Sequence, residues 1–429
     1  MIPSPSSGSL HTASGAGRPA FPFPVWAILL PALFLPGPAW SGGGCLTAQE
    51  LEANQVVHPD LLETMEYREV GPFRGGRSTA VGGFSDDPHQ FIMGTTGGGV
   101  WMTDDAGESW VNVTDGFLDV SSVGAVEVAP GDPNVIYVGT GSAGIRGNVI
   151  TGRGVWRSTD RGRSWSFMGL ENAGLIGKIQ VDPRDADVAF VAVLGNGFGK
   201  NEERGVYRTR NGGASWEQVL FVADSVGAVD LVMNPKNPRE LYAGMWRAER
   251  KPWTLIDASR DGGIWKTVDG GDTWTRLTDP SLDNGLPSET LFGRIGLAIS
   301  PANPLRVWAL ISAPDPHGGI WRTDDAGESW RKVNRDRRFR QRHWYYSHLE
   351  ADPRDPNTVY VMNTGTYRSV DGGGLHKIIL IYLCLFLNRT SAIELSCFDG
   401  EAFLNTKKTR NMSNINFYVL IGSERSGTN

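Results

Sequence analysis

The sequence predicts an all-β fold, a β-propeller of four-stranded blades with five full blades and part of a sixth. Two recurring elements predict it: an octet that ends in Trp, and a turn that begins with Asp or Asn, usually followed by Pro. The octet tryptophans are 51 to 58 residues apart, at Trp110, Trp165, Trp216, Trp274 and Trp330. Four strand-like runs in a period of this length match one propeller blade, whereas ordinary sandwiches lack such a strict period.

The octet has the pattern Ser/Thr-x-Asp-x-Gly-x-Ser/Thr-Trp. Its third position is Asp105, Asp160, Asn211, Asp269, Asp325 and, in a sixth copy that lacks the closing Ser/Thr and Trp, Asp371. An Asp or Asn can accept a bond from the backbone two residues on, Gly supplies a positive φ, and Trp buries apolar area while its N–H needs a polar partner. Because a catalytic residue would not recur in every repeat, we interpret the octet as a structural hairpin turn with its Trp on the following strand.

The second element supplies the other two strands of each blade. Turns begin at Asp87, Asp132, Asp185, Asn237, Asn303 and Asp355, and all but the one at Asp185 have Pro next. A β-branched and aromatic run follows each turn, and an apolar segment precedes most of them. Such runs beside turn residues predict a pair of antiparallel strands.

The N-terminal residues 1–48 have the features of a signal peptide, followed by a linker at 49–66. Arg18 precedes an apolar run at 20–40, and Leu46-Thr47-Ala48 resembles a cleavage site. Five prolines make this run a poor permanent membrane helix. We therefore expect an exported protein, periplasmic, at the cell surface or extracellular, with no stable membrane span after cleavage. Gly44-Cys45 leaves a lipidated N-terminus as the alternative.

The charge and the cysteine content argue against some classes of ligand. The 429 residues have a formal net charge of −6, which does not favour nucleic acid. The three cysteines and seven histidines form no cluster at metal spacing, so no metal site and no cofactor are expected. From residue 374 to 429 there is no Trp and no Pro, and the sixth octet fails where this tail begins. We therefore predict that 374–429 is an aberrant tail outside the fold.

The octets resemble the Asp-box, or BNR, repeats of sialidase-like propellers. Longer stretches, among them GLIGKIQVDP at 174–183, NEERGVYRTRNGGASW at 201–216, RKPW at 250–253 and YYSHLEADP at 345–353, are similar to sortilin/VPS10-like propellers of bacterial exported proteins, often labelled glycosyl hydrolases. The likeness covers about residues 67–373. It implies a propeller fold, while function must be argued from the site.

Propeller geometry predicts where a ligand would bind. The stereotyped turns share one face, so the long loops at 141–154, 195–205, 245–263 and 276–292 lie on the opposite face. The innermost strands begin on that face, and the residues near their starts include Arg77, Lys178, Arg294 and His348. A positive channel mouth would favour an anionic or polyhydroxyl ligand; the alternative is solvated or salt-bridged side chains. Arg204 and Trp253 are further ligand-binding candidates, from the loops.

Catalysis has weaker support. A glycosidase needs two carboxylates, for which the loops offer Glu202, Glu203, Glu249 and Asp257, although their spacing does not distinguish them from ordinary loop charges. A sialidase is disfavoured because the stretch 73–77 reads FRGGR and is not the sialidase signature. The basic-aromatic stretch 335–346 is expected to be a ligand rim or a salt-bridged loop. The predicted function is binding of a peptide or glycan without catalysis; the alternative is a glycoside hydrolase, sialidase- or xyloglucanase-like.

Overall fold

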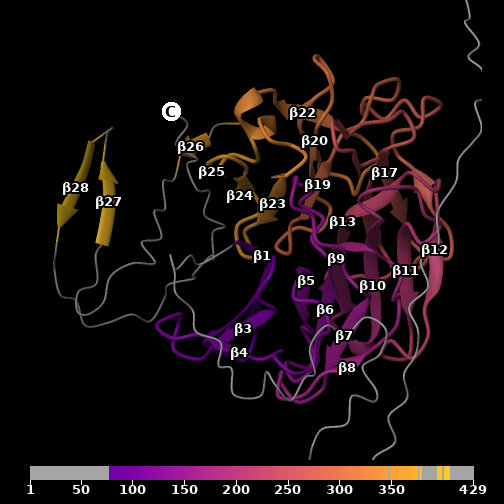
Figure 1. The fold of residues 1–429 in the computed structure, drawn as a ribbon. Helices are drawn as coiled ribbons and strands as arrows, with labels where there is room; N and C mark the ends of the chain where they lie inside the picture. Colours follow the sequence, from indigo (N-terminus) through magenta and orange to yellow (C-terminus); the bar gives the residue numbers. More distant parts are fainter. Residues whose placement is uncertain (1–76, 346, 375, 379–393, 399–400, 406–429) are drawn as a thin grey trace, which may run out of the picture. The chain divides into compact units, whose positions relative to one another are not determined.

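Six four-stranded antiparallel sheets follow one another along the chain and form the blades of a propeller (Figure 1). The structure is a computed structural model, and it describes residues 77–345, 347–374, 376–378, 394–398 and 401–405. The predicted signal peptide at 1–48 and linker at 49–66 lie outside these residues. In the described part of the chain, the only helical element is one turn of 3-10 helix, η2 (Arg337–Arg340). The all-β propeller prediction is confirmed.

Within each sheet, four strands pair in chain order from the centre outwards. The sheets are β1 (Ser78–Phe84), β2 (Asp87–Thr95), β3 (Val100–Thr103) and β4 (Val111–Asn112); β5 (Val123–Val128), β6 (Ile136–Thr140), β7 (Val155–Ser158) and β8 (Ser166–Phe167); β9 (Leu175–Asp182), β10 (Asp185–Gly195), β11 (Gly205–Thr209) and β12 (Glu217–Leu220); β13 (Gly227–Met233), β14 (Leu241–Trp246), β17 (Gly263–Thr267) and β18 (Thr275–Arg276); β19 (Ile295–Ile299), β20 (Val307–Ile311), β21 (Gly319–Thr323) and β22 (Arg331–Asn334); β23 (His348–Ala351), β24 (Val359–Met362), β25 (Thr366–Ser369) and β26 (His376–Ile378). The first strand of each sheet contacts the first strand of the next, so β1, β5, β9, β13, β19 and β23 are innermost.

The sixth sheet has four strands, where the sequence predicted only part of a blade. Its outermost strand, β26, pairs with β25 and comes from the first residues of the range 374–429. The boundary suggested at residue 373 therefore falls between two strands of one sheet. Farther along, β27 (Glu394–Phe398) and β28 (Glu401–Asn405) pair only with each other among the described strands. The prediction for the rest of the tail stays a prediction.

The hydrophobic cores lie between neighbouring sheets. In the described part of the chain, one buried cluster fills each space from the first sheet to the sixth, as with Ile92 of β2 and Val138 of β6, or Ile264 of β17 and Ile311 of β20. This arrangement explains why the innermost strands have apolar residues on both faces, because each strand packs against a sheet on either side. A further cluster around Trp246 lies beneath the loops at the starts of the inner strands.

The octets form the turns between the third and fourth strands, as predicted, but their hydrogen bonds differ from the expected turn. In the second octet, the Asp160 carboxylate accepts from the backbone N–H of Ser164, four residues on rather than two, at 2.8 Å, and from its hydroxyl at 2.6 Å. The Ser158 hydroxyl donates to Asp160 and accepts from the N–H of Gly162. These bonds, led by the Ser164 hydroxyl, lower the pKa of Asp160 to about 2.

Two of the octet tryptophans, Trp165 and Trp216, join one sheet to the sheet before it. The Trp165 indole N–H donates to the Val113 carbonyl at 2.8 Å, and the Trp216 indole N–H donates to the Met168 carbonyl at 2.6 Å. Val113 and Met168 each follow the outermost strand of the preceding sheet. The tryptophans stand just before the fourth strands and not on them, as Trp165 before β8 shows. The prediction of a polar partner for the indole is confirmed at these two positions and at Trp330, whose N–H donates to the Gly327 carbonyl of its own octet at 3.1 Å. It is wrong at Trp274, whose buried Nε1 has no partner among the described residues.

Candidate functional site

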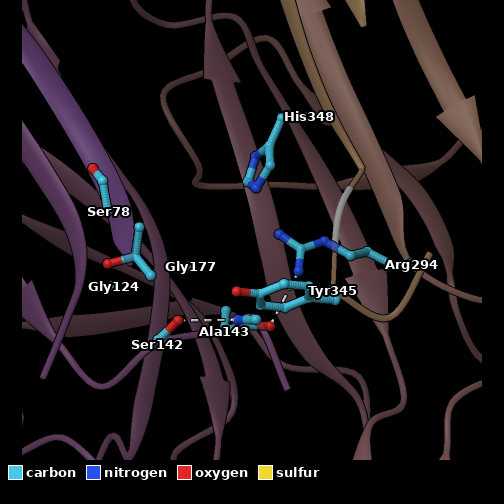
Figure 2. A pocket seen from close by; sticks show the side chains of 10 residues that line it. Ser78, Gly124, Ser142, Ala143, Gly177, Arg294, Tyr345 and His348 are labelled. Atoms are coloured by element: carbon cyan, nitrogen blue, oxygen red, sulfur yellow. Dashed lines mark hydrogen bonds between the residues drawn. The ribbon is translucent and has the colours of Figure 1, made fainter. Parts of the chain in front are cut away.

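A pocket opens where the inner strands begin, and Figure 2 shows the side chains that line it. The alternating strand directions place the octets and the Asp/Asn turns at the far end of the inner strands, so the two features lie on opposite faces. The cavity itself has a volume of about 30 Å³, and the surrounding empty space, which is partly open to solvent, brings this to about 380 Å³. We call it the mouth pocket, and its lining residues are Ser78, Thr79, Gly124, Ser142, Ala143, Gly144, Gly177, Arg294, Tyr345 and His348.

Backbone atoms form part of the pocket wall, at Gly124. A Cβ atom on this residue would lie 2.1 Å from the Ile176 carbonyl oxygen and 2.2 Å from the Gly141 carbonyl oxygen. Both contacts are shorter than any non-bonded approach allows, so the inner strands can come this close only with glycine. The chain thus requires Gly124 for packing at this point of the pocket wall.

Arg294 is the most deeply buried cation of the mouth pocket. Only 3% of the residue is exposed. Its Nη1 donates to the Ala143 carbonyl at 3.1 Å, and its guanidinium lies 5.9 Å from the centre of the Trp246 ring. Its buried Nε has no hydrogen-bond partner. Burial lowers the pKa of Arg294 to about 10, against the attraction of Asp230, so the side chain is still charged at neutral pH.

Tyr345 lies beside Arg294 and is held by two other arginines. Arg77 Nη1 donates to the Tyr345 hydroxyl at 2.7 Å, and its guanidinium lies 5.4 Å from the ring centre. The guanidinium of Arg146, from the loop after β6, lies 5.2 Å from the same ring. Cations at these distances are attracted to an aromatic face. The aromatic ring therefore gathers three cationic side chains at one end of the propeller.

His348, at the start of β23, lines the pocket as a neutral group. Burial, with help from Arg294 and Lys178, lowers the pKa of His348 to about 3. A neutral imidazole has one donor and one acceptor nitrogen, so it can bond either to a hydroxyl or to an anion. Figure 2 shows His348 on one side of the Arg294 guanidinium and Tyr345 on the other, with Ser78 and Gly124 across the space.

Three carboxylates surround Lys178 farther along the inner strands. Lys178 Nζ lies 3.8 Å from Glu350 Oε1, and Glu127 and Asp230 also act on it. Burial works against the charge of Lys178, but the three carboxylates outweigh it and raise its pKa. Burial raises the pKa of Glu127 to about 7 and raises that of Asp230 as well. Asp230 accepts from the backbone N–H groups of Leu231 and Leu297 at 2.9 and 2.8 Å.

The sequence identified part of this site. Of the predicted ligand-binding residues, the structure brings Arg294 and His348 into the mouth pocket, Arg77 against its Tyr345 and Lys178 into the nearby charge cluster. Glu127, Asp230 and Glu350 were missed. The sequence did contain an indication of these three residues, because each is the one acidic residue of a largely apolar inner strand. Tyr345 was noted only as part of a basic-aromatic stretch.

Arg204 is placed elsewhere. It is 1% exposed, and its guanidinium donates to the carbonyls of Leu194, Asn196 and Gly199 at 2.5, 2.7 and 2.8 Å. These bonds fix the loop between β10 and β11. Arg204 is therefore not brought to the mouth pocket, and its contacts are those of a residue that organises a loop.

Three of the four candidate carboxylates contact other side chains, and Glu202 is bonded through its backbone carbonyl. Glu249, 7% exposed, pairs with Lys251, and Glu203 accepts from the Asn201 amide at 3.0 Å. Asp257 Oδ2 lies 2.9 Å from His343 Nε2. The Glu202 carbonyl accepts from Gln218. No two of the four line the mouth pocket.

The loop after β14 contains a small hairpin of its own, β15 (Glu249–Arg250) and β16 (Leu255–Ile256). Trp253 lies at its tip and is 81% exposed, the highest exposure among the large apolar side chains of the described residues. An exposed tryptophan on this face can stack on a flat ligand. It is separate from the mouth pocket, which it does not line.

The stretch 335–346 is largely salt-bridged where the structure describes it. Arg337 and Arg340 pair with Asp315, and Arg338 pairs with Asp336. Of the two expectations for this stretch, the salt-bridged loop agrees with these contacts. In the parts of the chain that the structure describes, no group of His, Cys, Asp and Glu has the arrangement of a metal site, and no helix has the length and apolarity to cross a bilayer.

Comparison with curated proteins gives xyloglucanases among the relatives of this chain. No protein-family model matches the chain. A xyloglucanase from Paenibacillus sp is 23% identical over 334 residues, 68% of this chain and 30% of the relative. Xyloglucanase Xgh74A from Acetivibrio thermocellus is 23% identical over 332 residues, 66% of this chain and 36% of the relative. The chain thus spans about a third of the length of these curated relatives.

A solved structure agrees in fold. The crystal structure of an ancestral GH74 enzyme superimposes with a TM-score of 0.50 at 22% identity, over 72% of this chain and 38% of that one. The chain is accordingly a β-propeller related to GH74 xyloglucanases. The finer resemblance to sortilin/VPS10-like propellers is not confirmed by these comparisons.

Proposed function

We propose that this chain is the propeller region of a carbohydrate-active protein and that it binds a saccharide on the face opposite the octets. The observation that carries the proposal is the sequence similarity to xyloglucanases across about two thirds of the chain. The surface features on that face fit a polyhydroxyl ligand, because the mouth pocket combines hydroxyl, imidazole and guanidinium groups with backbone. Export, which a polysaccharide ligand would require, remains a prediction.

The test is binding of the full chain to a panel of xyloglucan, other neutral polysaccharides and acidic polysaccharides, followed by calorimetry on those that bind. Trp253→Ala should weaken binding of long saccharides, because an exposed indole offers a stacking surface. Phe167→Ala is the matched control, since Phe167 is an exposed aromatic on the outermost strand of the second sheet. Failure of every saccharide to bind, with binding of peptides instead, would contradict the proposal and favour the peptide alternative.

Glycoside hydrolysis is the second candidate, favoured by the names of the relatives. A glycosidase uses one carboxylic acid and one carboxylate on either side of the bond that is cleaved. Asp257 is the candidate of first choice, since it is part-exposed and lies beside an imidazole. Release of reducing ends from xyloglucan, lost in Asp257→Asn while binding persists, would support hydrolysis. Turnover that survives both Asp257→Asn and Glu249→Gln would exclude these two residues as the catalytic pair.

A further inference from the structure

Arg77 and Arg146, which contact the Tyr345 ring, and the pocket residue Arg294 have no carboxylate partner in the described part of the chain. Arg77, Arg146 and Arg294 form no ion pair with any residue that the structure describes, although ion pairs are common among the other arginines. An arginine on the surface can leave its charge to water. Arg294 cannot, because it is 3% exposed, and a buried charge without a counter-ion is costly.

The hydrogen-bond inventory of Arg294 is equally incomplete. A guanidinium has five N–H donors. Among the described residues one bond is made, from Nη1 to the Ala143 carbonyl, and Nε is buried without a partner. Figure 2 shows the guanidinium directed into the mouth pocket between His348 and Tyr345. The guanidinium therefore lies where a ligand in the mouth pocket could accept hydrogen bonds from it.

The carboxylates of the inner strands do not act as an ion-pair partner for Arg294 in the described structure. Asp230 attracts Arg294, but it accepts two backbone N–H bonds and lies outside ion-pair distance in the described structure. Glu350 pairs with Lys178. Glu127 has a pKa of about 7, so it is about half protonated at neutral pH. Among the residues that line the mouth pocket, Arg294 is the one cation and there is no carboxylate.

We infer that the mouth pocket takes the carboxylate of an acidic sugar, a uronate unit of a saccharide, with Arg294 as its principal partner. This inference rests on the proposed function for the saccharide and on Arg294 for the carboxylate. A carboxylate matches the planar guanidinium with two parallel hydrogen bonds. The hydroxyls of Ser78 and Ser142 and the neutral imidazole of His348 suit the remaining oxygens of a sugar. Arg146, exposed on the adjacent loop, adds attraction for the approaching anion.

The experiment is calorimetric titration of the full chain with oligogalacturonate and with the same oligosaccharide after reduction of its carboxyl groups. The acidic form should bind at least about tenfold more tightly, because a charge-assisted hydrogen bond is worth about a factor of ten or more. Arg294→Gln should remove this difference. Arg146→Gln should reduce it by a smaller factor, and because Arg146 is exposed this variant tests the idea without risk to the core. Arg184→Gln, an exposed charge at the turn between β9 and β10 on the octet face, should leave the difference unchanged.

The outcomes separate the two proposals. If the acidic and reduced forms bind equally well, the carboxylate inference is overturned. The proposed recognition of a saccharide is then still supported. Loss of the same factor in Arg184→Gln would also overturn it, because the effect would then be one of net charge. If no saccharide binds, the proposed function fails. If in addition short peptides with a free C-terminal carboxylate bind and their amides do not, the pocket is an anion site but the assignment to a sugar is wrong.

Discussion

Arg77 and Tyr345 are 268 positions apart in the chain, and the Arg77 guanidinium donates a 2.7 Å hydrogen bond to the Tyr345 hydroxyl. Arg77 directly precedes β1 of the first sheet, and Tyr345 lies in the loop that leads into β23 of the sixth. The contact therefore joins the first and last parts of the described propeller at the mouth pocket. No property of either local sequence predicts this pairing.

Removing that hydroxyl should destabilise the fold. We expect Tyr345→Phe to lower the free energy of unfolding by about 1 to 3 kcal/mol, because a hydrogen bond from a charged donor is lost and the guanidinium keeps its charge. Denaturant unfolding followed by tryptophan fluorescence measures this. Tyr207→Phe is the control, because Tyr207 is a buried tyrosine whose hydroxyl has no hydrogen bond in the described structure. A similar loss in both variants would show that the Arg77 bond is not the cause.

The octet offers a test with its own internal control. Asp160→Ala should lower the free energy of unfolding by about 1 to 2 kcal/mol, as for loss of a helix cap, because the hydroxyls of Ser158 and Ser164 and one backbone N–H lose their acceptor. Asp160→Asn should cost less. The third octet has Asn211 at this position, which accepts from the Ser215 N–H and donates to its hydroxyl. Thermal unfolding of both variants measures the two losses of stability. If Asp160→Asn lost as much stability as Asp160→Ala, the proposed role of the side-chain oxygen would be contradicted.

The Asp160 contribution should also depend on pH in a defined direction. Its folded-state pKa of about 2 is below its value of 3.8 in an unfolded chain. Its stabilisation is thus present above pH 4 and is lost as the pH falls towards 2. The difference in stability between the natural protein and Asp160→Ala should shrink over that interval.

Glu127 should act in the opposite sense. Its folded-state pKa of about 7 is above its unfolded value of 4.5, so the folded state holds a proton that the unfolded chain releases. Stability should decline between pH 5 and 8, and Glu127→Gln should reduce this decline by on the order of 1 to 3 kcal/mol. Lys178 and Glu350, the charged groups that face Glu127, are unchanged in this variant. Chemical denaturation at pH 5 and pH 8 provides the measurement, with exposed Glu108→Gln as control. An unchanged pH dependence in Glu127→Gln would contradict the prediction.

His348 should remain neutral far into the acid range. Burial, Arg294 and Lys178 lower its pKa to about 3, against 6.5 in an unfolded chain. NMR of the imidazole nitrogens, assigned by comparison with His348→Gln, should show the neutral ring at pH 5. As the pH falls from 6.5 towards 3, the unfolded chain binds a proton that the folded state does not, so stability should decrease. A charged ring at pH 5 would contradict the arrangement of cations around it.

Much of the fold follows from local chemistry. The octet and the Asp/Asn turn each fix a hairpin through residues within eight positions, and their recurrence predicts the number and order of the strands. The prediction of the octet's turn was less accurate in its backbone conformation and its hydrogen bonds. In the octet the fourth residue also has a positive φ, even as Ala106, Arg161 or Ala326, because the turn requires two consecutive left-handed residues. The Asp accepts from the fourth residue on because that turn is longer than an Asx-turn.

The candidate site was predicted only in part, because its side chains come from positions that are far apart in the sequence. Strand order and direction were enough to place the starts of the inner strands on one face, which led to Arg294 and His348. Which side chains touch there depends on how six sheets twist and pack, and no local pattern encodes this. Arg204 shows the limit most clearly: in sequence it is another loop arginine on the same face, but its donors are used by three carbonyls of its own loop.

The sequence by itself determined the architecture, because the interactions that build each blade join residues a few positions apart and repeat in every copy. It determined the octet face and hence the opposite face as the place for a ligand. The tertiary structure alone decided that Arg294 is buried without a described carboxylate partner while Lys178 has Glu350, and that Tyr345 contacts both Arg77 and Arg146. The physical reason is that burial and the pairing of charges depend on residues from different blades, which packing alone brings together.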